Sequence, residues 1–205
     1  MIRESDIFQQ NSLVNKKFLE TIKAHNGVLF YLPFHQLRLE SAIGKNVIEL
    51  SEILDPPKSG LYRCRVVYNA EGYEVSYHPY SKRSVTKLKL IEDNFIEYAK
   101  KYADRSALNA LFSQKEDADD VLIVKNGLLT DTTIANVAFL YKNSWITPKQ
   151  ALLNGTTRMR LRLEGRIIEE EIYADDIGKF EAMALMNAMI DFDIIRNKKI
   201  EEIVC

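Results

Sequence analysis

The segment from Leu153 to Arg158 has the residue types of a phosphate-binding helix start. Its sequence, Leu-Asn-Gly-Thr-Thr-Arg, predicts a helix that begins near Gly155 and runs to about Leu163. N–H groups in the first turn of a helix have no partner within the helix, so with threonine hydroxyls beside them they can bind phosphate. A simpler interpretation is that Thr156 only caps the helix. The segment by itself leaves both interpretations open.

Polar residues also mark three other expected elements. They are Phe18-Leu19-Glu20-Thr21-Ile22 on an early strand, His35-Gln36-Leu37-Arg38-Leu39 at a helix start, and Gly127-Leu128-Leu129-Thr130-Asp131 with the following Asn136 at a turn. Taken singly, Arg38 is explained by a solvated helix face and Asp131 by an acid beside a turn. No one of these segments establishes a function.

Several common kinds of site are absent from the sequence. There is no G-x-x-x-x-G-K-[ST], G-x-G-x-x-G, C-x-x-C or H-E-x-x-H motif, and no G-x-S-x-G elbow of a serine hydrolase. The three histidines and the absence of clustered cysteines make a zinc site improbable. We therefore expect no metal centre.

Composition restricts the class of protein further. The chain has 205 residues, 46% of them hydrophobic, and 28 Lys+Arg against 29 Asp+Glu give a net charge of −1. This length predicts one large domain or two small ones, and the near-zero charge gives no reason to expect nucleic acid or an anionic membrane as a partner. Two cysteines, no signal-like N-terminus and no apolar run of ~18 residues indicate a cytoplasmic protein outside the membrane.

Turn signals divide the first 85 residues into hairpins around one helix. Asn-Gly favours tight hairpins because both residues tolerate positive φ. We expect strands at Lys17–Ala24 and Val28–Leu32, a helix at His35–Ile48, a proline loop at Asp55–Gly60, and strands at Leu61–Tyr68 and Tyr73–Tyr77. This ββαββ order predicts a two-layer α+β domain at residues 1–85.

The remaining residues, 86–205, are predicted to form a second, α/β domain. We expect a strand at Ser84–Ile91 near the boundary, a helix at Ser106–Gln114, strands at Val121–Val124, Asn136–Leu140 and Trp145–Thr147, the helix from Gly155, a strand at Arg166–Ile172, a helix near Ile177–Met186 and two short final strands. Hairpins and short helices without a βαβ rhythm disfavour a doubly wound nucleotide-binding fold.

Taken together, the motifs resemble a known family. F-x-E-T, H-x-x-R-L, G-x-x-T-[ED]-x-x-x-x-N, T-P and L-x-G-T-x-R occur in this order between about Phe18 and Leu163. In this order they resemble the fold-type IV pyridoxal-phosphate enzymes, or class IV aminotransferases. That family includes branched-chain and D-amino-acid aminotransferases and 4-amino-4-deoxychorismate lyase. The resemblance implies a small N-terminal α+β domain, a C-terminal α/β pseudo-barrel, pyridoxal 5'-phosphate as cofactor and a homodimer.

The resemblance also assigns the residues that act on the cofactor. Lys101, followed four residues later by Arg105, matches the lysine that bonds the cofactor, whereas its rival Lys100 lacks an arginine at that spacing. Such an amine acts as nucleophile and proton shuttle only when it is neutral. The acid beside the cofactor's ring nitrogen is glutamate in the family and Asp131 here, with a side chain shorter by ~1.5 Å.

The same resemblance implies how the phosphate is held. Its ligands would be Arg38, the start of the helix at Thr156 and Thr157, and the N–H groups around Ile134 and Ala135. Asn136 would orient that loop, and Glu20 and Thr21 would shape the site. The chain is shorter than typical members of the family, and its N-terminal domain looks trimmed.

Three functions fit the resemblance. We favour a lyase that converts 4-amino-4-deoxychorismate to 4-aminobenzoate and pyruvate, a step toward folate, because compact members with a reduced first domain look more like that branch. An aminotransferase for branched-chain or D-amino acids uses the same cofactor residues, and a non-catalytic member is the third possibility. Arg63 and Arg65 alternate on one strand face and could meet substrate carboxylates, although a solvated strand face explains them equally well.

Overall fold

The computed structural model describes residues 16–45, 48–195 and 204, which form two compact units. The first unit contains the chain up to Ser81 together with Lys100–Asp104, and the second contains Lys82–Ala99 and the chain from Arg105. The sequence-based division at residue 85 stays a prediction. Within the described residues, no helix is both long and apolar enough to cross a membrane.

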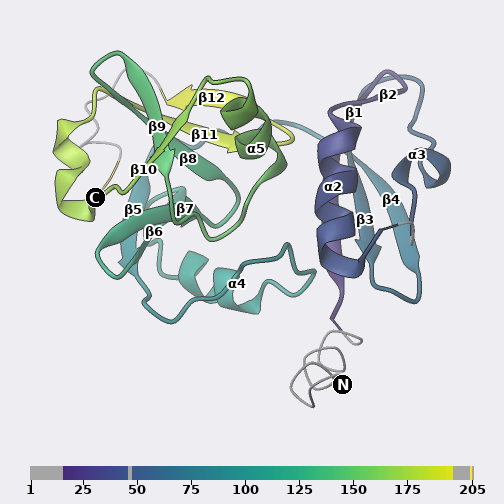
Figure 1. Ribbon diagram of the computed structural model, residues 1–205, viewed down its shortest axis with the longest axis horizontal. Helices are drawn as coiled ribbons and strands as arrows, with labels where there is room; N and C mark the ends of the chain where they lie inside the picture. The colour runs from purple at the N-terminus through teal and green to yellow at the C-terminus, as the bar shows by residue number, and fades with distance from the viewer. Residues whose placement is uncertain (1–15, 46–47, 196–203, 205) are drawn as a thin grey trace, which may run out of the picture. The chain divides into compact units, whose positions relative to one another are not determined.

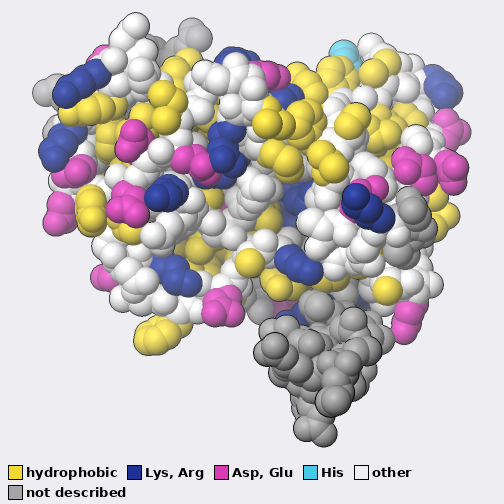
Figure 2. All heavy atoms as spheres, viewed as in Figure 1, with side chains coloured by type: hydrophobic (Ala, Val, Ile, Leu, Met, Phe, Trp, Pro, Cys, Tyr) yellow, Lys and Arg dark blue, Asp and Glu magenta, His cyan; other side chains and the backbone are white. Residues whose placement is uncertain are grey.

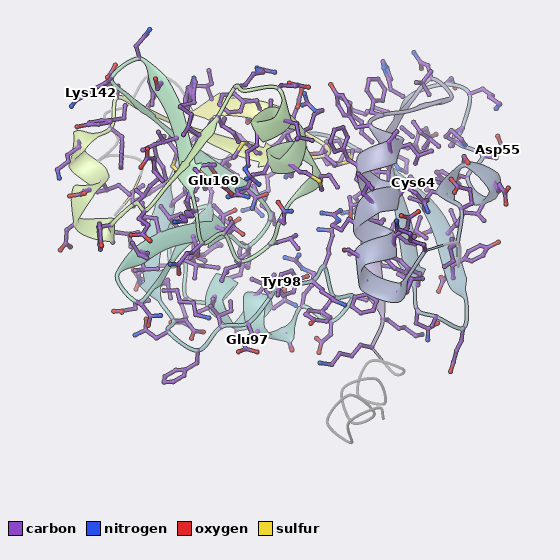
Figure 3. All side chains as sticks on the ribbon, in the orientation of Figure 1. Asp55, Cys64, Glu97, Tyr98, Lys142 and Glu169 are labelled. Carbon is purple, nitrogen blue, oxygen red and sulfur yellow. The ribbon has the colours of Figure 1, made fainter. Side chains whose placement is uncertain are left out.

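The first unit is a four-stranded antiparallel sheet with one long helix on it (Figure 1). The strand order is β2-β1-β3-β4, and the elements are β1 (Phe18–His25), β2 (Val28–Leu29), α2 (Leu32–Ile43), α3 (Leu50–Ile53), β3 (Leu61–Tyr68) and β4 (Tyr73–Pro79). Cys64, labelled in Figure 3, packs with Ile22, Val66 and Leu39 in the core between this sheet and α2. The ββαββ order is as predicted, with α3 added.

Three boundaries in this unit differ from the sequence-based prediction. The strand expected to reach Leu32 ends at Leu29, because Tyr31 is left-handed (φ 55°) and α2 begins at the next residue. The helix expected at His35–Ile48 therefore starts earlier, and it ends at Ile43 because Gly44 (φ 98°) leaves the helical conformation. Part of the expected helix, residues 46–47, lies outside the described residues.

The second unit is built on a larger sheet whose strand order is β10-β9-β8-β7-β6-β5, with β11 paired to β8 and β12 paired to β11. Its elements are β5 (Leu88–Glu92), α4 (Ser106–Phe112), β6 (Asp120–Lys125), β7 (Leu128–Thr132), β8 (Asn136–Tyr141), β9 (Ser144–Pro148), α5 (Thr156–Leu163), β10 (Ile168–Glu170), η1 (Ala174–Lys179), β11 (Ala182–Asn187) and β12 (Asp191–Ile195). Among the described strands of this unit, only the β5–β6 and β9–β10 pairs are parallel, so hairpins dominate as expected. The β6–β7 turn has positive φ at both Asn126 (52°) and Gly127 (75°), as a tight Asn-Gly hairpin requires.

One helix predicted in the second unit is wrong, because most of the segment forms a strand. The helix expected near Ile177–Met186 is instead the end of the short 3₁₀ helix η1 followed by strand β11. β11 lies between β8 and β12 and is buried on both faces, so its sequence is a continuous apolar run without alternation. Such a run cannot be distinguished from a buried helix by periodicity.

Smaller differences concern length only. The strand expected at Ser84–Ile91 starts later, at Leu88, and the one expected at Arg166–Ile172 is limited to Ile168–Glu170. The helix expected at Ser106–Gln114 ends at Phe112.

Basic and acidic side chains are interspersed over the face seen in Figure 2, in keeping with a net charge of −1.

Candidate active site

In the first unit, a buried carboxylate joins strand β1 to helix α2. Glu20 is fully buried, and its two oxygens accept hydrogen bonds from Arg38 Nε (2.8 Å) and Arg38 Nη2 (2.6 Å). His35 Nδ1 lies 2.6 Å from Glu20 Oε2, and it must donate because an ionised carboxylate only accepts. The H-x-x-R spacing places both donors on one side of α2, one turn apart.

The charges in this cluster are fixed by their partners. Burial alone would raise the pKa of Glu20, but the Arg38 charge and hydrogen bonds, with those of His35, outweigh it and hold the pKa at about 2. Burial lowers the pKa of His35 despite its bond to Glu20, and the positive charges of Arg38 and Lys101 lower it further. Glu20 is therefore ionised, and its pairing with Arg38 orients the guanidinium that the sequence predicts as a phosphate ligand.

Lys101 belongs to this unit because its segment runs along the edge of β1. Leu19 N–H donates to the Lys101 carbonyl (2.8 Å), Ala103 N–H donates to the Lys17 carbonyl (2.9 Å), and Phe18 and Tyr102 form an antiparallel bridge. The rival Lys100 places its Nζ 3.3 Å from the Ala42 carbonyl and 5.5 Å from the centre of the Phe18 ring. Lys100 is thus engaged at α2, and the choice of Lys101 as the reactive lysine stays a prediction.

In the second unit, the predicted ring-nitrogen acid is buried among neutral donors. Asp131 on β7 accepts hydrogen bonds from Asn136 Nδ2 (2.8 Å) and from the Leu153 N–H (2.9 Å). Burial raises its pKa to about 6, although these bonds and the more distant Arg158 charge act in the opposite direction. Among the described residues Asp131 forms no ion pair. This acid is therefore available to a cationic partner.

Asn136 connects the acid to the start of helix α5. Besides donating to Asp131, Asn136 Nδ2 donates to the Leu153 carbonyl (2.8 Å), so one amide holds both the acid and the loop before α5. Gly155, the N-cap of α5, lies against the same amide, and a Cβ at this position would come within 2.0 Å of Asn136 Oδ1. Only glycine fits here without displacing Asn136.

The start of α5 has the composition of an anion site. Thr156 and Thr157 are its first two residues, both are 4% exposed, and Gly155 provides no capping side chain. Their N–H groups have no partner within the helix. The possibility that Thr156 is the N-cap is thereby excluded. Arg158 links α5 to strands β9 and β10. Its Nη2 donates to the Pro148 carbonyl (2.7 Å) and to Glu169 (2.6 Å; Glu169 is labelled in Figure 3).

The predicted donors at the β7–β8 loop are already engaged within the loop. The N–H groups of Ile134 (3.3 Å) and Ala135 (3.0 Å) both point to Thr132 Oγ1, and Arg105 Nη2 donates to the Thr133 carbonyl (2.8 Å). Thr132 and the Leu153 main chain were not anticipated from the sequence, because a hydroxyl or an amide used for local bonding carries no motif. A phosphate role for Ile134 and Ala135 stays a prediction.

Pyridoxal 5'-phosphate requires an anion site for its phosphate and an acid for its ring nitrogen. The N-terminus of α5, with Thr156 and Thr157, has the donors for the first. Each Asp131 oxygen accepts one of the two hydrogen bonds described, so lone pairs remain for a further donor. A buried carboxylate held by neutral groups is stabilised in its ionised form when a cation such as a protonated ring nitrogen lies beside it. The residues of this unit therefore fit the cofactor.

Comparison with known proteins agrees with these features. The family model described as amino-transferase class IV matches residues 73–197. A protein of Haemophilus influenzae Rd, named only as uncharacterized, is 36% identical over 180 residues, which cover 83% of this chain and 96% of that protein.

Two solved structures share the fold. A "putative 4-amino-4-deoxychorismate lyase" from Haemophilus somnus 129pt has a TM-score of 0.79 and 33% identity, covering 85% of this chain and 97% of that chain. The pyridoxal-phosphate-bound form of a hypothetical aminotransferase from Mycobacterium tuberculosis has a TM-score of 0.72, covering 94% and 84% of the two chains, and at 14% identity it shows the fold alone. The predicted two-domain fold class is thus confirmed, and pyridoxal phosphate is used by members of this fold family. Because the family model spans more than half of the sequence and a relative is matched over nearly its whole length, this chain belongs to the class IV aminotransferase family, as the order of its motifs predicted.

Proposed function

We propose that this protein is a pyridoxal-phosphate-dependent lyase that converts 4-amino-4-deoxychorismate to 4-aminobenzoate and pyruvate. The observation that carries this choice is the match to the Haemophilus somnus protein, which is 33% identical and covers 97% of that chain and 85% of this one. The class of chemistry is supported separately by the buried Asp131 and the anion site at the start of α5.

The roles of the residues follow from their chemistry. The bound cofactor supplies an electron sink. Lys101 Nζ would bond the cofactor and take the proton from the carbon that carries the substrate amine, which requires the amine to be neutral. Asp131 would hold the ring nitrogen in its protonated form, and the N–H groups of Thr156 and Thr157 would bind the phosphate. Arg38, oriented by Glu20, would supply a further charge to that phosphate.

An aminotransferase is the alternative, and it is supported by the match of residues 73–197 to the family model described as amino-transferase class IV. It would use the same residues, with Lys101 Nζ passing the proton on to C4′ of the cofactor instead of letting pyruvate leave. The two reactions differ in the substrate they must hold. A lyase must accommodate a ring with two carboxylates, whereas an aminotransferase must exchange an amino acid for a 2-oxo acid.

The first test is the absorbance spectrum of the protein with added pyridoxal phosphate. We expect a band near ~410–420 nm, typical of a lysine-bound cofactor, that is lost in Lys101→Ala. Lys100→Ala is the matched control, because Lys100 is adjacent but contacts the Ala42 carbonyl, and it should keep the band. No band in the unchanged protein would contradict a pyridoxal-phosphate enzyme and leave the non-catalytic interpretation.

The second test separates the two reactions. Release of 4-aminobenzoate and pyruvate from 4-amino-4-deoxychorismate supports the lyase, and 2-oxo-acid-dependent exchange without 4-aminobenzoate supports the aminotransferase.

The homodimer implied by the family is likewise a proposal. Sedimentation should then give twice the 23.6 kDa of one chain.

A further inference from the structure

Strand β6 begins with a buried acid. Leu122 and Val124 belong to the apolar core of the second unit, and Asp120 lies two residues before Leu122 on the same face of the strand. Asp120 is 1% exposed. Its Oδ2 is buried and has no hydrogen-bond partner in the part of the chain that the structure describes. A buried polar atom without a partner costs stability, so packing alone does not account for an acid at this position.

The other oxygen of Asp120 holds the loop between β7 and β8. Asp120 Oδ1 accepts hydrogen bonds from Thr133 Oγ1 (2.7 Å) and from the Val121 N–H (2.8 Å). Thr133 is itself buried, and its carbonyl accepts a hydrogen bond from Arg105 Nη2 (2.8 Å). The first residue of β6 and the residue that precedes α4 therefore both hold Thr133.

The loop that contains Thr133 begins directly after the acid predicted to face the ring nitrogen. Asp131 and Asn136 are paired across β7 and β8, so residues 132–135 close this hairpin. The position of the loop thus affects both residues of the Asn136–Asp131 hydrogen bond (2.8 Å). Because β6 is the neighbour of β7 in the sheet, the bond from Asp120 fixes the loop relative to the sheet.

We propose that Asp120 is a positioning residue for the cofactor, which through Thr133 fixes the β7–β8 loop and with it the direction in which Asp131 presents its carboxylate. This inference rests on the proposed function, because it assumes that Asp131 pairs with the ring nitrogen. A group that binds a cofactor must be held within a fraction of an ångström by its supporting hydrogen bonds, so a small shift of the loop weakens the interaction. Asp120 acts through Thr133, and no contact with the substrate is assigned to it.

The test removes the Asp120–Thr133 hydrogen bond without leaving one partner alone. Asp120→Val/Thr133→Val replaces both groups by apolar side chains of similar shape, which can leave stability nearly unchanged. We expect the dissociation constant of pyridoxal phosphate, measured by fluorescence titration of the full chain, to rise about 10-fold. Thr133→Ser keeps the hydroxyl and should keep the affinity. Asp117→Asn is the matched control, because this acid precedes β6, pairs with Lys87 and is 79% exposed.

A double-mutant cycle with Asp131→Asn separates positioning from a general loosening of the fold. On the unchanged background Asp131→Asn should raise the dissociation constant of pyridoxal phosphate about 10-fold. On the Asp120→Val/Thr133→Val background the increase should be less than about 3-fold, because the loop no longer holds the acid in place. Equal increases on both backgrounds, or an unchanged dissociation constant in Asp120→Val/Thr133→Val, overturn the inference. Either result leaves the proposed lyase intact.

The same cycle on the cofactor-free protein distinguishes a failure of this inference from a failure of the proposed function. Because burial raises the pKa of Asp131 to about 6, Asp131→Asn should gain stability at pH 7, measured by urea denaturation. The gain should be smaller in Asp120→Val/Thr133→Val, where the released loop lets water reach Asp131. A smaller gain in a protein that binds no pyridoxal phosphate supports the role of Asp120 in holding Asp131 and contradicts the proposed function. An equal gain on both backgrounds overturns that role, whether or not the cofactor binds.

Discussion

Two buried carboxylates, one in each unit, have pKa values that are shifted in opposite directions. Glu20 accepts hydrogen bonds from a guanidinium and an imidazole, and its pKa is held at about 2 against the effect of burial. Asp131 accepts from neutral donors, the Asn136 side-chain amide and main-chain N–H groups, and burial raises its pKa to about 6. Burial is similar at the two positions, so the charge of the partner decides. Glu20 is a positioning residue for Arg38, whereas Asp131 is suited to a cation that the chain itself does not provide.

The largest expected effect on stability follows from removing the anion that pairs with Arg38. In Glu20→Gln the Arg38 side chain, 10% exposed, keeps its charge without a counter-ion, and we expect a loss of about 3–5 kcal/mol in the free energy of unfolding. Urea denaturation measures this change. Asp55→Asn is the control, because Asp55 (labelled in Figure 3) forms an exposed pair with Lys58, and such a pair contributes about 0–1 kcal/mol. Equal effects of the two substitutions would contradict the assignment of Glu20 as a buried anchor.

The pH dependence of stability should distinguish the two acids by its sign. Because the folded-state pKa of Asp131 is raised, its contribution is fully present below the unfolded value of 3.8 and is lost as pH rises through about 6. Asp131→Asn should therefore gain stability relative to the unchanged apo-protein between these pH values, by roughly 3 kcal/mol. The Glu20 contribution has the opposite sign, since it is present above pH 4.5 and is lost as pH falls through about 2. A difference between Asp131→Asn and the unchanged protein that does not vary from pH 4 to pH 6 would show that Asp131 is not desolvated.

The smallest of these effects should follow from crowding Asn136. Gly155→Ala places a Cβ within 2.0 Å of Asn136 Oδ1, so the amide must shift from Asp131 and the Leu153 carbonyl. We expect a loss of about 1–3 kcal/mol in stability, as for overpacking, and weaker binding of pyridoxal phosphate measured by fluorescence titration. Gly72→Ala is the control, because a Cβ at Gly72 meets nothing within 4 Å. Unchanged cofactor affinity in Gly155→Ala would separate Asn136 from the cofactor site.

Much of the local structure could be predicted from residue type. The Asn126-Gly127 turn adopts positive φ at both residues, and α5 begins at Thr156, directly after Gly155. These features depend on conformations that only a few residues tolerate, so they are visible in the sequence. By contrast, the apolar sequence of β11 predicts a helix where a strand forms, because the neighbouring strands β8 and β12 bury both of its faces.

The sequence by itself determined the family, the turns, and the residue types of the site, because motif order and backbone preference are local properties of the chain. Only the tertiary structure decided the ionisation and the hydrogen-bond partners of each group. It paired Glu20 with Arg38, surrounded Asp131 with neutral donors, and turned the N–H groups of Ile134 and Ala135 toward Thr132. It also aligned Arg65 on β3 with Thr21 on β1. These outcomes depend on burial and on partners distant along the chain, and both the pKa of an acid and the availability of a donor are set by those surroundings.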